Sequence, residues 1–281
     1  MGRAAAGNGA LRNVLVHLDG SDAARQRLRL AHRVGRRFGA HLYALFCVEP
    51  TIAALRLAIS EAPAALFETQ EGTALRRARR WFDEEAGAAR AATWLEAEGD
   101  DACAAFLRQA RLADLAIVGQ SDEDTSGEAR IPEAVIWGTG KPVLVIPSFG
   151  NVKPIGTTVL VGWKSGREAA RAVNDALPFL SRAKSVTVLA IDPEKGISGE
   201  GAVPAADIAL HLARHGVTAT AAHTISTGIG EGDVLLNYAS DLGADLIVAG
   251  GYGHSRAREF VLGGATRSLL GTMTVPVLFS H

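Results

Sequence analysis

Cysteine is scarce in this sequence, and the two that occur are far apart. Among 281 residues only Cys47 and Cys103 are present, and neither belongs to a C-x-x-C pair. This usage excludes a disulfide framework and gives no indication of a cysteine zinc site. It is typical of proteins of the reducing cytoplasm, which is the compartment we expect.

Long apolar runs and a charge excess are also missing. No run approaches the roughly 18 apolar residues of a membrane span, so we expect no membrane partner. The formal net charge of −1 creates no strong field for nucleic acid, and none is expected to bind. The Ala/Gly-rich start lacks the apolar segment of a signal peptide, so residues 1–10 are predicted to form a flexible tail.

Charged residues do cluster locally. The basic clusters Arg25–Arg27 and Arg76–Arg80 are interpreted as solvated helix faces. His211 and His215 have the spacing of two metal ligands on one helix, but no third ligand accompanies them. We interpret them as a surface pair and expect no metal site.

Glycines between Gly250 and Thr266 are the most informative feature. The apolar run Asp245–Ala249 before them predicts a buried strand, and Thr266–Leu270 predicts the opening of a helix. Glycines at such a junction let backbone N–H groups approach an anion, and the helix dipole favours a phosphate there. The stretch predicts a nucleotide-type ligand. The alternative is that the glycines only permit a tight strand-to-helix connection.

The chain contains two similar halves. Three pairs of segments match in order: Asn13–Ser21 with Thr158–Ser165, Ala113–Gly119 with Ala244–Gly250, and Gly140–Val145 with Thr274–Phe279. Strand-like and helical patterns fill the gaps, so each half is predicted to run β-α-β-α-β-α-β-α-β. This alternation indicates a parallel sheet with helices on both faces. Ser165 and Glu168 form a capping-box pattern that predicts a helix from about Gly166.

The two halves resemble tandem universal stress protein domains. The motif that carries the resemblance is G-x-x-G, nine residues, then glycine and a small residue, here Gly250, Gly253, Gly263 and Gly264. The resemblance implies an α/β fold with two doubly wound, Rossmann-like parallel sheets. We expect one domain at 11–148, a linker at 149–156 and a second domain at 157–281.

The family resemblance also implies a ligand and its contacts. In ATP-binding members the glycine loop wraps the phosphates, an aspartate after the first strand lies near ribose and adenine, and the segment after the second strand contacts the base. The resemblance therefore implies ATP or a related adenine nucleotide, with or without Mg²⁺. The residues matched in the second half are Gly162, Trp163, Lys164, Ala190, Ile191, Gly250, Gly253, His254, Gly263, Gly264, Ala265 and Thr266.

Each half departs from the family pattern. In the second half Lys164 stands at the aspartate position, and Gly264 replaces a Ser/Thr, with Thr266 two residues on. The first half keeps Asp19, interpreted as a helix N-terminal residue rather than a nucleotide contact. Its glycine loop is replaced by the acidic Gln120–Asp124, which repels a polyphosphate. We predict at most one nucleotide site, in the second half.

Three functions remain as alternatives. The first is a non-enzymatic stress-response module that binds an adenine nucleotide and an unidentified regulatory protein. The second is a nucleotide-free interaction module, which by family analogy would pair through Val143–Ile146 and Val277–Phe279, within one chain and in a homodimer. The third is an adenine-nucleotide α-hydrolase, whose S-G-G-x-D-S loop is missing from the sequence. No residue is indicated as a general base, although slow ATP hydrolysis stays open.

Overall fold

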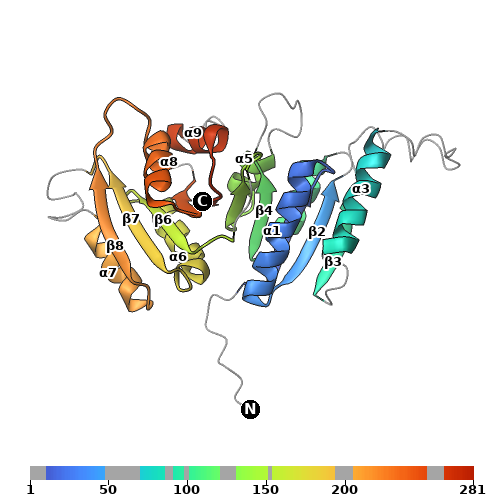
Figure 1. Ribbon diagram of the computed structural model, residues 1–281, viewed down its shortest axis with the longest axis horizontal. Helices are drawn as coiled ribbons and strands as arrows, with labels where there is room; N and C mark the ends of the chain where they lie inside the picture. Colours follow the sequence, from blue (N-terminus) through green and yellow to red (C-terminus); the bar gives the residue numbers. More distant parts are fainter. Residues whose placement is uncertain are drawn as a thin grey trace, which may run out of the picture. The chain divides into compact units, whose positions relative to one another are not determined.

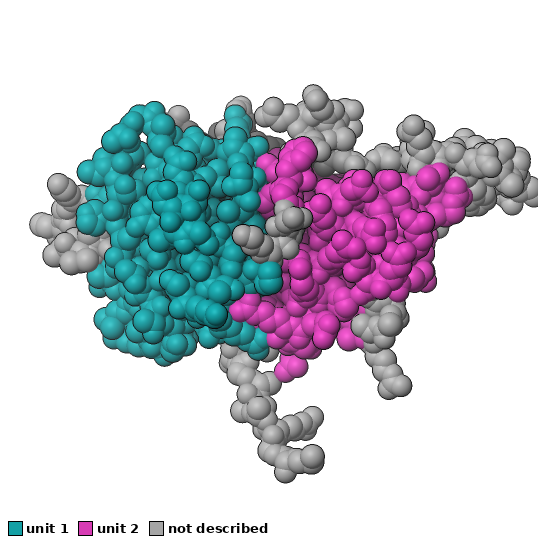
Figure 2. Space-filling model, in the orientation of Figure 1, with its two compact units in different colours: residues 1–10, 153–281 teal, residues 11–152 magenta. Residues whose placement is uncertain are grey.

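The computed structural model describes residues 11–47, 70–85, 91–97, 101–120, 131–150, 154–193, 205–251 and 263–281. The chain divides into two compact units, which Figure 2 shows in different colours. One unit holds Leu11–Val152 and the other holds Lys153–His281, so the division falls inside the segment 149–156.

The first unit is a parallel sheet with the strand order β3-β2-β1-β4-β5 (Figure 1). Its helices α1 and α3 contact each other, and so do α4 and α5. The elements are β1 (Asn13–Leu18), α1 (Asp22–Phe38), β2 (His41–Cys47), α3 (Gln70–Glu85), β3 (Ala92–Ala97), α4 (Ala102–Ala110), β4 (Leu115–Gly119), α5 (Ile131–Gly138) and β5 (Val143–Ile146).

The second unit repeats this topology, with the strand order β8-β7-β6-β9-β10, again parallel. Helix α6 packs on β9 and β10, α7 packs on β8, and α8 contacts α9. The elements are β6 (Thr158–Trp163), α6 (Arg167–Leu180), β7 (Ser185–Ile191), α7 (Ala206–Arg214), β8 (Ala219–Thr224), α8 (Glu231–Leu242), β9 (Leu246–Gly250), α9 (Gly264–Thr272) and β10 (Val277–Ser280).

The two units share the same strand register. Val14 faces Leu115 across the β1–β4 pair, and Val159 faces Leu246 across the β6–β9 pair. In both units the first helix begins at the fourth residue after the first strand. The register therefore gives a residue-by-residue correspondence in which positions 17, 19 and 27 of the first unit match 162, 164 and 172 of the second.

Apolar periodicity explains why these segments form these elements. Five consecutive residues of β1 are buried, as expected for a strand covered on both faces of a parallel sheet. Along α1 the buried positions form one face at helical spacing: Ala24, Arg27, Leu28, Leu30, Ala31, Val34 and Gly35. The helix ends at Gly39, whose φ of 66° is the left-handed conformation that glycine adopts without a steric penalty.

Helices α8 and α9 make an unusually close contact. A Cβ on Gly232 would lie 2.8 Å from the carbonyl oxygen of Ala265 and 2.8 Å from the Cβ of Ser268. The Ser268 hydroxyl donates a hydrogen bond of 2.6 Å to Asp233 Oδ1. Glycine at position 232 is therefore needed for the two helices to approach this closely.

The predicted fold class is confirmed, whereas the predicted capping box is wrong. Helix α6 begins at Arg167 and its N-cap is Gly166, which has no side chain to donate or accept. Ser165 lies one residue too early for the capping role. No helix in the described part of the chain is long and apolar enough to cross a membrane.

Candidate functional site

A cavity of about 150 Å³ lies in the second unit at the carboxyl ends of its central strands. It sits where β6 and β9 lie side by side and their following connections leave in opposite directions, which is the usual ligand position of a doubly wound sheet. The lining residues are Gly162, Trp163, Lys164, Gly166, Glu168, Ala169, Leu189, Ile191, Glu231, Leu235, Ala249, Gly250, Gly263, Gly264, Ala265, Thr266 and Leu269.

The structure brings most of the residues matched by resemblance to this cavity. Those that line it are Gly162, Trp163, Lys164, Ile191, Gly250, Gly263, Gly264, Ala265 and Thr266. Ala190 does not line the cavity. Side chains alternate between the two faces of a strand, so Leu189 and Ile191 line it and Ala190 does not. Gly253 and His254 lie outside the described residues.

Three helices begin at the cavity, and each has a glycine as its N-cap. The N-caps of α6, α8 and α9 are Gly166, Gly230 and Gly263, and none of them makes a side-chain cap hydrogen bond. The first N–H groups of a helix have no partner within the helix, and the dipole makes this end positive. Among the three, α9 has no acidic residue in its first turn. The arrangement favours an anion, most of all at α9.

Two of the three corresponding helices of the first unit, α1 and α4, are capped by side chains. Ser21 Oγ accepts a hydrogen bond of 3.1 Å from the N–H of Ala24 at the start of α1. Asp101 Oδ1 accepts bonds of 2.9 and 3.2 Å from Cys103 and Ala104 at the start of α4. These helix ends are therefore satisfied internally, and they offer less to an external anion than the glycine-capped ends of the second unit.

The glycines of the cavity serve different purposes. A Cβ on Gly250 would lie 2.8 Å from the backbone nitrogen of Ala169 and 2.8 Å from the carbonyl carbon of Glu168. Gly250 is therefore required for α6 to pack on β9, whether or not a ligand binds. A Cβ on Gly264 would meet nothing within 4 Å. The helix start at Gly264 is open, and packing does not demand glycine there.

Charged side chains surround the cavity. Lys164 Nζ forms an ion pair of 3.0 Å with Glu231 Oε1, and both side chains are largely exposed. Burial acts to raise the pKa of Glu168, but its hydrogen bond from Arg167, its own backbone N–H and the charges of Arg167 and His281 outweigh it and lower that pKa. Glu168 thus stays ionised, and its carboxylate interacts with Arg167 and with its own backbone N–H at the start of α6.

Asp192 follows β7 and holds two loops of the same edge together. It is one of two described non-glycine residues with positive φ, at 47°. Its Oδ1 accepts a bond of 2.8 Å from the N–H of Ser226, and its Oδ2 accepts one from the Ser226 hydroxyl. These bonds, with the charge of Lys164, lower the pKa of Asp192 against the effect of desolvation. Backbone strain of this kind concentrates at functional sites.

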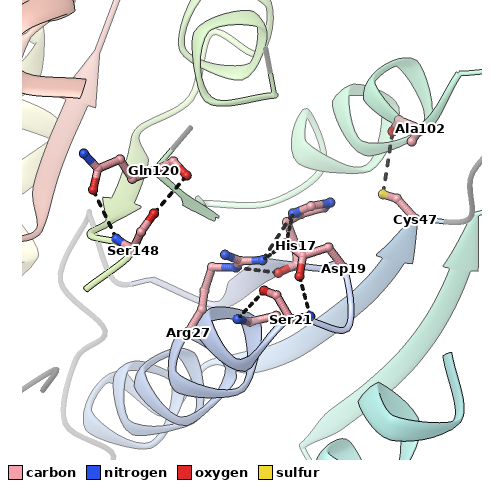
Figure 3. Close-up of polar contacts among 9 residues, drawn as sticks. His17, Asp19, Ser21, Arg27, Cys47, Ala102, Gln120 and Ser148 are labelled. Atoms are coloured by element: carbon pink, nitrogen blue, oxygen red, sulfur yellow. Dashed lines mark hydrogen bonds and ion pairs between the residues drawn. The ribbon is translucent and has the colours of Figure 1, made fainter. Parts of the chain in front are cut away.

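A cluster of His17, Asp19 and Arg27 occupies the equivalent place in the first unit (Figure 3). The Arg27 guanidinium donates to the carbonyl oxygen of His17 at 2.7 Å and to Asp19 Oδ2 at 2.8 Å. A Cβ on Gly119 would lie 2.1 Å from Arg27 Nη1. The guanidinium therefore spans the ends of β1 and β4, and the counterparts of these strand ends in the second unit, Gly162 and Gly250, line the cavity.

The cluster is buried, which shifts the ionisation of its members. Burial and, to a smaller extent, the Arg27 charge together lower the pKa of His17 to about 4, although the charge of Asp19 opposes them. Burial acts to raise the pKa of Asp19, but the Arg27 charge, together with His17 and the hydrogen bonds from Ser21, outweighs it and holds the pKa of that carboxyl well below its usual range. The cluster therefore contains a neutral imidazole and a charged ion pair.

Two sequence interpretations are corrected here. Arg27 was assigned to a solvated helix face, yet it is 3% exposed. Asp19 was interpreted as a helix N-terminal residue, yet Ser21 is the N-cap and Asp19 pairs with Arg27. The signal for Arg27 was present in the sequence, because it lies at i+3 from Ala24 and four residues before Ala31, on the apolar face of α1.

Metal-binding geometry is not found in the described part of the chain. No group of three or more His, Cys, Asp or Glu residues there is placed to hold a metal ion. The His211 and His215 rings lie 4.8 Å apart, as expected for neighbours on one helix face.

Comparison with known proteins identifies the second half of the chain. Residues 157–281 match the universal stress protein family. No curated protein matches the chain significantly. A universal stress protein from Archaeoglobus fulgidus is similar over 95% of both chains, with 14% identity and a TM-score of 0.70. A functionally unknown protein from Pseudomonas aeruginosa is similar over 97% of this chain and 93% of its own, with 15% identity and a TM-score of 0.59. These two similarities show the fold.

Proposed function

We propose that the second unit, whose residues 157–281 match the universal stress protein family, binds ATP or a related adenine nucleotide. The nucleotide would control partner choice in a stress response, without catalysis by this chain. The observation that carries the proposal is the convergence of three glycine-capped helix N-termini on one cavity.

The cavity suggests how the ligand would lie. The phosphate group belongs at the start of α9, where the first turn contains no acidic residue and Gly264 leaves open space. The apolar side chains of Leu189, Ile191 and Trp163 lie at the ends of β7 and β6 and offer a surface to the base. Lys164 supplies a cation in place of the family's aspartate.

The first unit serves as a scaffold in this proposal. The buried Arg27 guanidinium spans the junction of β1 and β4 and is already paired with Asp19. The side-chain caps at Ser21 and Asp101 take up helix N–H groups that an anion would need. One nucleotide per chain is therefore the expected stoichiometry.

A charge placed at residue 264 tests the site without disturbing the fold. Gly264→Asp puts a carboxylate where the phosphate should bind, and the open space there accommodates it. An acidic residue in the first helical turn favours the helix, so the variant should fold. Gly264→Asn is the matched control, since it has nearly the same shape and no charge.

Calorimetric titration with AMP and ATP, with and without Mg²⁺, gives the readout. We expect Gly264→Asp to bind at least tenfold more weakly than Gly264→Asn. Nucleotide recovered from freshly purified, acid-denatured wild-type protein should approach one equivalent per chain. If no nucleotide is recovered and millimolar Mg-ATP does not bind, the nucleotide proposal is wrong and a nucleotide-free interaction module is favoured.

A further inference from the structure

The ion pair between Lys164 and Glu231 is exposed to solvent and can open at little energetic cost. The two side chains are 55% and 39% exposed, so water and salt screen their attraction. Glu231 is also the first residue of α8, where the helix dipole stabilises its charge without help from Lys164. Separating the two charges therefore costs little on either side.

The corresponding pair of the first unit is fixed. Asp19 occupies the position of Lys164, and its partner Arg27 is at 2.8 Å with side chains only 19% and 4% exposed. Opening that pair would leave a buried charge without compensation. The same place in the repeat thus holds a permanent pair in one unit and an exchangeable pair, of opposite polarity, in the other.

We propose that Glu231 sets the affinity of the second-unit cavity for anions by competing with the ligand for Lys164. With no anion bound, Lys164 is held by Glu231. When a phosphate group binds, Lys164 leaves Glu231 and pairs with the phosphate, while Glu231 remains at the start of α8. The inference rests on the proposed nucleotide site and adds a residue that tunes it.

The surroundings of the pair support an exchange. Both residues line the cavity, and Gly232, next to Glu231, touches the first turn of α9. Lys164 therefore pairs with Glu231, and the residue after Glu231 contacts the start of α9, the helix end that favours the anion. The charge of Lys164 also lowers the pKa of Asp192, but the Asp192 carboxylate is hydrogen-bonded to Ser226. Glu231 is the carboxylate that contacts Lys164 directly.

A double-mutant cycle separates competition from simple repulsion. We would measure Kd for AMP and for inorganic phosphate in wild type, Glu231→Gln, Lys164→Met and the double variant. Asp241→Asn, which removes a carboxylate from the opposite end of α8, is the charge control. Thermal melting confirms that each variant is folded.

Competition predicts a specific pattern. Glu231→Gln should bind AMP about two- to fivefold more tightly, the range expected from an exposed ion pair. Lys164→Met should bind more weakly, and in that background Glu231→Gln should change Kd by less than about 1.5-fold. Asp241→Asn should match wild type.

Three results would overturn the inference, and they are distinguishable. An unchanged Kd in Glu231→Gln, with normal AMP binding by wild type, rejects the role of Glu231 and leaves the nucleotide site intact. A full gain that persists in the Lys164→Met background identifies plain charge repulsion instead. If wild type and Glu231→Gln both bind neither AMP nor phosphate, the proposed nucleotide site fails together with this inference.

Discussion

Removing the Arg27 charge should destabilise the first unit by about 3 kcal/mol. Arg27→Met keeps the unbranched stem and removes the guanidinium, which leaves the Asp19 carboxylate without its partner. Breaking a buried pair from one side costs about 3–5 kcal/mol. The lower end applies because the Asp19 side chain keeps 19% of its exposure.

Arg29→Met is the matched control on the same helix. Arg29 pairs with Glu85 at 2.6 Å, a shorter distance than the 2.8 Å between Arg27 and Asp19, but its side chain is 48% exposed. Exposed pairs contribute about 0–1 kcal/mol. The comparison therefore asks whether burial or distance decides the energy, and we expect burial to decide it.

Urea unfolding at pH 7, followed by tryptophan fluorescence, gives the measurement. Three of the four tryptophans, Trp81, Trp94 and Trp137, lie in the first unit. With a slope of about 2 kcal/mol/M, Arg27→Met should lower the midpoint by about 1.5 M and Arg29→Met by less than about 0.5 M. Equal midpoints for the two variants would refute the reasoning. Adding Asp19→Asn to Arg27→Met should recover at least about 1 kcal/mol.

Two further predictions concern stability. His17 has a folded pKa of about 4, below the model-peptide value of 6.5, so the unfolded chain takes up this proton first. Stability should fall by up to about 3 kcal/mol as pH drops from 6.5 to 4, and urea midpoints across that range should show a smaller slope in His17→Gln. Gly250→Ala places a methyl group 2.8 Å from backbone atoms of α6 and should lower stability by about 1–3 kcal/mol. Gly271→Ala, whose Cβ would meet nothing within 4 Å, should be neutral or slightly stabilising in the same thermal melts, and equal losses would contradict the packing argument.

The fold could be predicted from the sequence because the patterns that indicate strands and helices are local and occur in both halves. Continuous apolar strands and helical periodicity predicted the alternation of elements, and the repeat predicted that both halves share it. The position of the candidate cavity followed from the same alternation, since glycines after β9 must lie at the carboxyl edge. Side chains alternate between the two faces of a strand, and this rule applied to β7 would have predicted Leu189 instead of Ala190 beside Ile191 at the cavity.

Burial of charge was harder to foresee. Arg27 was grouped with neighbouring arginines by composition, although its helical position placed it on the apolar face. Its partners His17 and Asp19 lie in β1 and just after it, and only the tertiary structure shows that the guanidinium bonds to both. Ser165 failed as a cap for a related reason, because the chain enters α6 one residue later and Glu168 turns back on its own backbone.

The close contact of α8 with α9 has a mechanical consequence. With Gly232 against Ala265 and Ser268 bonded to Asp233, a shift of one helix relative to the other would break these contacts. Ile229, which is 47% exposed, lies two residues before α8. We therefore expect a ligand at the start of α9 to displace the start of α8 as well, so that occupancy of the cavity changes the exposed surface around Ile229.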